Sequence, residues 1–294
     1  MQVRPRRSVL YMPGSNTRAL EKAKSIAADA LILDLEDAVA PDAKAEARNN
    51  VCTAVKSGGY GRRELVIRVN ALDTEWGVDD LAAACDAAPD AILVPKVSHP
   101  GDVTSAAKIL TARRVPQKTR LWAMVETPHA ILNAREIAAL GADPESRLTC
   151  FVLGTNDLLK ESRARANNNR FAVVPWLAIT LVAARAYRID VLDGVYNDFR
   201  NEAGLRDECE HGRTLGMDGK TLIHPAQVGP CNEVFSPTRD EVEWSRKIIA
   251  AFAEPKNANK GVITVDGKMV ELLHMVMAKR VVAIAEAIAV SEAA

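Results

Sequence analysis

The sequence predicts an α/β protein, a closed (β/α)8 TIM barrel followed by a C-terminal helical extension. Short runs rich in Leu and β-branched residues alternate with Ala-rich segments of helical period. Eight such units fill about 225 residues, close to the roughly 250 residues of a typical barrel. Residues 11–16, after the first strand, lack the G-x-G-x-x-G turn of an open nucleotide-binding sheet. These observations favour the barrel over a doubly wound sheet.

Eight strands are expected, each built around an apolar run. The runs are, in order, Val-Leu-Tyr-Met, Leu-Ile-Leu, Leu-Val-Ile, Ile-Leu-Val, Leu-Trp-Ala-Met-Val, Phe-Val-Leu, Val-Leu and Thr-Leu-Ile. They predict strands at 8–12, 30–35, 64–70, 91–95, 121–126, 148–154, 190–193 and 219–224. Alternation with helices makes the sheet parallel, because each crossover returns the chain to the same sheet edge.

The segments between the strands have the spacing of amphipathic helices. They predict helices at 17–28, 44–57, 77–87, 103–114, 129–140, 175–187 and 201–215. Two further helices, 239–253 and 269–290, flank a polar, turn-rich stretch at 254–267. We therefore assign residues 1–235 to a barrel domain and 236–294 to a helical extension, whose last helix is expected to pack away from its own barrel.

Composition excludes several classes of protein. The 294 residues are 48% hydrophobic, and 38 Lys and Arg balance 38 Asp and Glu, so no net charge favours nucleic acid or an anionic membrane. The five Cys form no C-x-x-C pair, which fits a reducing cytoplasm. We expect no signal peptide in residues 1–7, and no membrane span, because Pro175 and Thr180 interrupt the longest apolar stretch.

Polar residues gather where the predicted strands end. In a barrel these ends face the open mouth, so catalytic groups are expected there. The segments are 34–37, 68–70, 95–96, 126–128, 154–157, 193–194 and 224–225. Carboxylates dominate this ring, with one Arg and one Lys. Without a thiol or His cluster, they suit a hard cation, Mg²⁺ or Mn²⁺, rather than zinc.

Glu126 and Asp157 end neighbouring predicted strands and are the expected metal ligands. Two protein ligands leave positions for water and for the oxygens of a 2-keto acid. The alternative is that either carboxylate caps the following helix.

Arg68 is expected to bind a carboxylate or a developing enolate oxygen, or to neutralise Glu36 or Asp37. Glu36 and Asp37 either orient metal-bound water or pair with Arg68 and Lys96. A Schiff-base role for Lys96 lacks the apolar pocket that it needs. His224 is interpreted as a packed imidazole at a strand end.

Seven short motifs follow one another along nearly the whole chain. They are Arg7-Ser8-x-Leu10-x-x-Pro13-Gly14, Asp34-Leu35-Glu36-Asp37-Ala38-Val39 with Lys44 and Ala47-Arg48, Arg68-Val69-Asn70, Glu126-Thr127-Pro128, Leu153-Gly154-Thr155-Asn156-Asp157-Leu158, Leu215-Gly216-x-Asp218-Gly219-Lys220-x-x-Ile223-His224-Pro225-x-Gln227 and Asp266-Gly267-Lys268-Met269. Their order and spacing resemble the citrate lyase β-subunit-like family, which includes malyl-CoA and citramalyl-CoA lyases, within the HpcH/HpaI aldolase superfamily.

The resemblance implies an Mg²⁺-dependent carbon–carbon lyase that joins or separates an acyl-CoA enolate and a small 2-keto acid. Its substrate would be a 3-hydroxyacyl-CoA thioester such as malyl-, citramalyl- or citryl-CoA. The match makes Glu126 and Asp157 metal ligands, puts Arg68 beside the keto-acid and thioester oxygens, and puts Glu36 and Asp37 near the metal-bound waters. Substrate contacts are also expected from Thr155, Asn156 and Asp157, at the end of the sixth strand.

Coenzyme A contacts are expected from the basic residues of the first helix, Arg18, Lys22 and Lys24. The alternative interpretation of these residues is a solvated helix face.

In the resembled family, the C-terminal segment of a neighbouring subunit delivers a carboxylate from a Met-Ile/Val-Asp motif. This chain has Met269-Val270-Glu271, so Glu271 stands where Asp is expected. The requirement for a neighbour implies a homo-oligomer, a trimer or hexamer. The longer side chain either is accommodated or shifts the balance from C–C cleavage to thioester hydrolysis.

Four alternatives to the lyase stay open: an acyl-CoA thioesterase of the same family, an aldolase that acts without CoA, a citrate lyase β-subunit that needs acyl-carrier and transferase partners, and a scaffold without catalysis.

Overall fold

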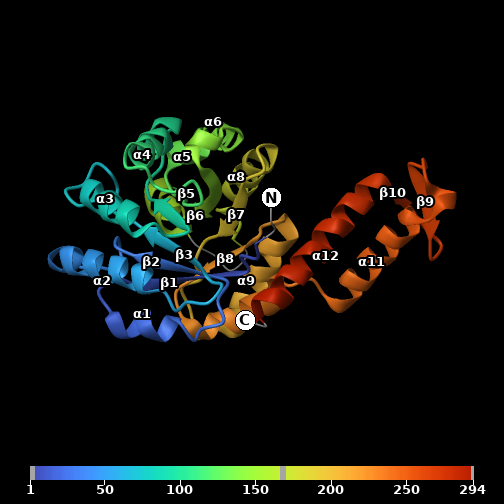
Figure 1. Ribbon diagram of the computed structural model, residues 1–294, viewed down its shortest axis with the longest axis horizontal. Helices are drawn as coiled ribbons and strands as arrows, with labels where there is room; N and C mark the ends of the chain where they lie inside the picture. The colour runs from blue at the N-terminus through green and yellow to red at the C-terminus, as the bar shows by residue number, and fades with distance from the viewer. Residues whose placement is uncertain (1–3, 166–169, 293–294) are drawn as a thin grey trace. The chain divides into compact units, whose positions relative to one another are not determined.

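A computed structural model describes residues 4–165 and 170–292 of the chain. Contacts between residues divide it into two compact units, one formed by Arg6–Phe235 and the other centred on Ser236–Ala294. The first unit contains eight strands, and the second contains two long helices and a small hairpin (Figure 1). Each unit has a hydrophobic core of its own.

The larger unit is a closed barrel of eight parallel strands in sequential order, as the sequence predicts. Every predicted strand is present, with ends that differ by at most two residues. The barrel closes between β1 and β8, where Ser8 lies beside Lys220. The strands are β1 (Ser8–Pro13), β2 (Ala30–Asp34), β3 (Glu64–Arg68), β4 (Ala91–Val94), β5 (Arg120–Val125), β6 (Leu148–Leu153), β7 (Asp190–Asp193) and β8 (Gly219–Leu222).

Helices surround this barrel and bury the outward-facing side chains of its strands (Figure 1). Successive strand residues point to opposite faces, so each strand supplies both the layer under the helices and the barrel interior. The helices are α1 (Thr17–Ala23), α2 (Lys44–Ser57), α3 (Gly77–Ala87), α4 (Pro100–Ala112), α5 (Pro128–Leu132), α6 (Ala134–Ala139), α7 (Thr155–Ser162), α8 (Val174–Ala186), α9 (Glu202–Leu215) and α10 (Val228–Phe235). Short 3₁₀ turns lie at Pro41–Ala43, Leu140–Ala142, Pro144–Ser146 and Pro225–Gln227.

The barrel interior is filled, and its N-terminal end is sealed by charge pairs. Trp122 and Cys150 are completely buried within it. Below them the Arg6 guanidinium lies 5.0 Å from the Trp122 ring centroid and pairs with Glu64 and Asp190. A filled interior leaves the opposite end, where the strands finish, as the place for a site.

The helical extension differs from the sequence prediction at one point. The predicted helix 269–290 begins later, as α12 (Leu272–Glu292), because residues 268–271 form a strand. That strand, β10 (Lys268–Glu271), pairs antiparallel with β9 (Val262–Val265) inside the stretch expected to be irregular. Asp266 and Gly267 form the turn with φ of 47° and 77°, which suits a two-residue hairpin.

This second unit is held together by a small core. Helix α11 (Arg239–Ala253) packs against α12, with a 3₁₀ turn at Pro255–Asn257 after it. Ile248, Ile263, Val265, Val270 and Ala278 are buried between the helices and the hairpin.

Two predicted barrel helices also differ from the structure. The segment 129–140 is two helices, α5 and α6, which meet at Asn133, and α1 ends at Ala23 instead of residue 28. Among the described residues, no helix combines the length and the apolar composition of a membrane span.

Gly219 begins β8, where the barrel closes, and a substitution there tests the packing at this point. A β-carbon there would overlap the Arg6 backbone, so Gly219→Ala should lower the free energy of unfolding by about 1–3 kcal/mol in urea titrations followed by circular dichroism. Gly229→Ala is the control: this helical glycine has open space around it, and alanine should stabilise α10 by about 0.5–1 kcal/mol. Equal stability of the two variants would contradict the packing described at Gly219.

Candidate active site

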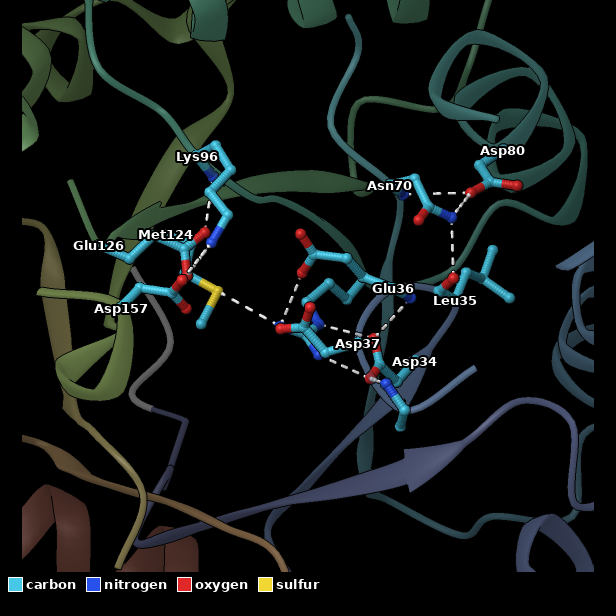
Figure 2. Close-up of polar contacts among 12 residues, drawn as sticks. Asp34, Leu35, Glu36, Asp37, Asn70, Asp80, Lys96, Met124, Glu126 and Asp157 are labelled. Atoms are coloured by element: carbon cyan, nitrogen blue, oxygen red, sulfur yellow. Dashed lines mark hydrogen bonds and ion pairs between the residues drawn. The ribbon is translucent and has the colours of Figure 1, made fainter. Parts of the chain in front are cut away.

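The mouth of the barrel brings together most of the residues that the sequence singles out. Glu36 and Arg68 come from the ends of β2 and β3, and Glu126 and Asp157 follow β5 and β6. Figure 2 shows Glu36 on one side and Glu126 with Asp157 on the other, with the Met124 sulfur between them. This sulfur lies 3.8 Å from Arg68 Nη1.

Arg68 is held by a pair of parallel hydrogen bonds from the neighbouring strand. Its Nε and Nη2 each donate to an Asp34 carboxylate oxygen at 2.6 Å. The parallel register aligns these two residues, so the last residues of β2 and β3 form the pair. The guanidinium also lies 4.9 Å from the Tyr11 ring centroid. Both ends of the pair are buried, which fixes the orientation of the guanidinium.

Asp34 also shapes the loop that carries Glu36. Its two oxygens accept hydrogen bonds from the backbone N–H groups of Glu36 (3.0 Å) and Ala38 (3.1 Å). Glu36 Oε2 then lies 2.8 Å from Arg68 Nη1 (Figure 2). Burial raises the pKa of Glu36 to about 8, although Arg68 opposes the shift. The Asp37 carboxylate is largely exposed and 3.4 Å from Arg68 Nη1, so Arg68 pairs with both predicted acids.

A buried polar network supports this loop from behind. Lys44 Nζ donates to the carbonyls of Leu35 (2.9 Å) and Glu36 (2.7 Å) and to Asn70 Oδ1 (2.8 Å). Asn70 Nδ2 donates to the Leu35 carbonyl and to Asp80 Oδ2, as Figure 2 shows. Helix α2, helix α3 and the end of β3 are therefore joined to the same turn.

The second group centres on Glu126, which is completely buried. Its Oε1 accepts the Lys96 backbone N–H at 2.7 Å, and Lys96 Nζ lies 2.8 Å from Asp157 Oδ1 and 3.5 Å from Glu126 Oε2. Lys96 thus pairs with these two carboxylates and not with Glu36 or Asp37. Burial raises the pKa of Glu126, against the opposing effect of the Lys96 charge. Burial alone would lower the pKa of Lys96, but the two carboxylates raise it.

This pair of carboxylates fits a hard divalent cation. Glu126 Oε2 is buried and, within the described part of the chain, makes no hydrogen bond, so it has a free acceptor position. Gly154 keeps this space open, because a β-carbon there would lie 2.7 Å from Glu126 Oε2. Among the described residues no cluster of three or more acidic, His or Cys side chains forms a closed cage. Two carboxylates with room for water match the requirements of Mg²⁺.

Helix capping does not explain Glu126, because the neighbouring Thr127 performs it. Thr127 Oγ1 accepts the N–H of Ala130 at 3.0 Å at the start of α5. Asp157 does lie in the first turn of α7, where a negative charge is stabilised by the helix dipole.

The other predicted residues have varied surroundings. Thr155 is buried at the start of α7, whereas Asn156 is exposed and exchanges two hydrogen bonds with Asn197 in the loop after β7. His224 stacks on Phe199 with ring centroids 4.7 Å apart and accepts the Ala226 N–H, but the residue is exposed, so the prediction of a packed imidazole is wrong.

The basic residues considered for CoA lie on or just after α1. Arg18 and Lys22 are exposed, and Lys24 pairs with Glu21 at 2.6 Å while its ammonium lies 5.6 Å from the Tyr60 ring centroid. Glu271 ends β10 in the second unit, where its N–H donates to His274 Nδ1.

The roles of three residues at the site were not predicted from the sequence. Asp34 is the anchor of Arg68, Lys96 bridges the two predicted metal ligands, and the Tyr11 hydroxyl is buried against Arg68 with no hydrogen-bond partner among the described residues. Alternation along β1 and β2 was an available signal, since Tyr11 and Asp34 have the inward parity of Val9 and Ile32. No pattern in the sequence could have paired Lys96 with its partners.

The closed barrel, with carboxylates and one fixed arginine at its C-terminal mouth, has the architecture of the (β/α)8 barrel enzymes. Residues 7–225 match the HpcH/HpaI aldolase/citrate lyase family, and the chain belongs to that family.

Relatives match along nearly the whole chain. A (3S)-malyl-CoA thioesterase of Cereibacter sphaeroides (strain ATCC 17025) is 52% identical over 98% of this chain and 97% of its own length. The citrate lyase subunit beta of Escherichia coli K12 is 36% identical over 92% and 90%. CitE from Mycobacterium tuberculosis, solved with magnesium, acetoacetate and coenzyme A, has a TM-score of 0.76 and 26% identity over 96% of this chain and 98% of its own.

The Arg68–Asp34 pair should dominate the stability of the mouth. Asp34→Ala leaves a buried guanidinium without its main partner, so the free energy of unfolding should fall by roughly 3–5 kcal/mol in urea titrations. Asp86→Ala removes an exposed partner of Arg113 and should change stability by no more than about 0.5 kcal/mol. Similar losses in the two variants would contradict a special role for the buried pair.

Proposed function

We propose that this chain is an Mg²⁺-dependent enzyme that hydrolyses the CoA thioester of a small hydroxy dicarboxylic acid, of the malyl-CoA type. The observation that carries hydrolysis is the full-length similarity to a (3S)-malyl-CoA thioesterase. The site supports the choice of substrate, because a carboxylate pair suited to a cation and a fixed arginine share one barrel mouth.

In this proposal Glu126 and Asp157 hold the cation, which supplies a Lewis acid for the oxygens at the hydroxy-acid end. Arg68 binds the thioester oxygen and stabilises the negative charge that develops on it. Asp34 keeps the guanidinium oriented, so little reorganisation is needed during the reaction. Glu36 and Asp37 orient water on the Arg68 side, and Thr155 and Asn156 flank the substrate at the start of α7.

The hydrolytic step balances without a further co-reactant. The oxygen of water forms a bond to the thioester carbon, and the carbon–sulfur bond then breaks. A carboxylate accepts a proton from water and returns it to the departing CoA sulfur. We propose Glu271 for this role, supplied by β10 of a second copy in a homo-oligomer, a trimer or hexamer. The CoA moiety would meet the basic face of α1, from Arg18 to Lys24.

Carbon–carbon cleavage is the second candidate, and the similarity to citrate lyase subunit beta favours it. The same arginine would stabilise an enolate oxygen once the bond between the second and third carbons of the acyl chain breaks. For malyl-CoA the products would be acetyl-CoA and glyoxylate. Citramalyl- and citryl-CoA would release pyruvate and oxaloacetate.

Product analysis separates the two reactions. With Mg²⁺ in ¹⁸O-labelled water, the purified chain should convert (3S)-malyl-CoA to free CoA and malate with one ¹⁸O in the new carboxylate, as read by mass spectrometry. EDTA should stop turnover, and Glu126→Gln and Asp157→Asn should each reduce it by about a hundredfold or more.

The control for these variants is Glu161→Gln, an exposed acid on the same helix as Asp157, which should keep full activity. Unlabelled acetyl-CoA with glyoxylate would establish the lyase instead. Turnover that survives EDTA and both substitutions would overturn the metal assignment.

Subunit complementation tests the proposed role of Glu271. Glu126→Gln and Glu271→Gln should each be inactive alone. Co-expressed in equal amounts with different tags, they should regain about a quarter of wild-type activity, because a random assembly pairs an intact barrel with an intact Glu271 at that frequency. No recovery in isolated mixed oligomers would contradict delivery from a second copy.

A further inference from the structure

Lys96 has an unusual backbone for a residue with a long side chain. It follows β4 with φ of +53°, a left-handed conformation that residues with a β-carbon seldom adopt. Two hydrogen bonds hold it there: its N–H donates to Glu126 Oε1 at 2.7 Å, and its carbonyl accepts the Ser98 hydroxyl at 3.1 Å. The side chain therefore starts from a fixed point beside the carboxylate pair.

The ammonium of Lys96 pairs with both Glu126 and Asp157, the two acids that are proposed to share a cation. Figure 2 shows its contacts with both carboxylates, and it lies 2.8 Å from Asp157 Oδ1 and 3.5 Å from Glu126 Oε2. One positive charge faces two acids here, and Glu126 Oε2 still lacks a hydrogen bond among the described residues. The two carboxylates, of which Glu126 is buried and Asp157 is partly exposed, are thus only partly neutralised.

An ammonium and a divalent ion cannot both occupy this position. Magnesium approaches carboxylate oxygens to about 2.0–2.1 Å, which would bring two positive centres close together around the same oxygens. The Lys96 side chain is one-third exposed, and its four-carbon stem is flexible, so its ammonium can move into the mouth.

We propose that Lys96 is a resident cation of the Glu126–Asp157 pair, which its ammonium neutralises until a divalent cation displaces it. Lys96 is then a positioning residue that lowers the affinity for the metal while it keeps the metal-free site intact. The displaced ammonium lies at the mouth, available to an anionic substrate. This inference rests on the metal site in the proposed function.

Manganese titration tests the displacement without any assay of turnover. Metal-free full-length protein is titrated with Mn²⁺, and free Mn²⁺ is measured by electron paramagnetic resonance. Lys96→Met should tighten the Kd about tenfold or more, because the competing charge is gone. Lys96→Arg retains the charge, so its Kd should stay closer to that of wild type. The control is Lys108→Met, which removes an exposed lysine and should have the same Kd as wild type. Simple damage to the site would instead weaken binding.

Thermal unfolding provides a second readout. Without metal, Lys96→Met should have a lower Tm than wild type, and saturating Mn²⁺ should remove the difference. An unchanged or weaker Kd in Lys96→Met, with normal binding by wild type, overturns the role of Lys96 and leaves the proposed function standing. Mn²⁺ binding by Lys96→Met but not by wild type would support the proposed role of Lys96. If neither protein binds Mn²⁺, the proposed metal site and the role of Lys96 both fall.

Discussion

The mouth of this barrel depends on the buried pair between Arg68 and Asp34. A guanidinium removed from water must be paired, and Asp34 pairs with it through both carboxylate oxygens. The same oxygens accept the backbone N–H groups that turn the chain after β2. One carboxylate therefore aligns two strand ends, fixes the arginine and sets the loop from which Glu36 meets that arginine.

On the opposite side of the mouth the buried charge is negative, and its partner is a cation. Glu126 is buried without a full set of partners, so the pocket demands positive charge. Lys96, which follows the neighbouring strand β4, supplies one positive charge, and a divalent ion would supply two. In the proposed arrangement the site has the fixed charge of Arg68 on one side and, on the other, the charge of Lys96 or of a divalent ion that displaces it. A substrate with oxygens at both ends of a short acid suits this arrangement.

Sequence patterns predicted the fold well because strand and helix periods depend on local chemistry. All eight strands and the ring of polar strand ends were accessible in this way. Pairing within the ring was not, since it depends on side-chain conformations and on the left-handed backbone of Lys96. The hairpin was missed although Asp266 and Gly267 are a strong turn signal, because the polar stretch before it indicated irregular structure. The metal ligands, CoA contacts and domain roles remain predictions, as does the cytoplasmic location.

Hydrolysis and carbon–carbon cleavage require nearly the same functions from the residues of the barrel. Both need the hydroxy acid held and an oxyanion stabilised, and in the proposed function Arg68 stabilises the oxyanion of either reaction. They differ in the atom that exchanges a proton: water and sulfur in hydrolysis, the hydroxyl and the acyl carbon in cleavage. In the proposed function, the position of the group that transfers the proton therefore determines which reaction occurs. Glu271 in place of the Asp of the resembled family adds one methylene and moves its carboxylate by about 1 Å, a displacement large enough to change which atom lies within hydrogen-bond reach. The reaction is thus expected to be decided outside the barrel, by the hairpin that carries Glu271.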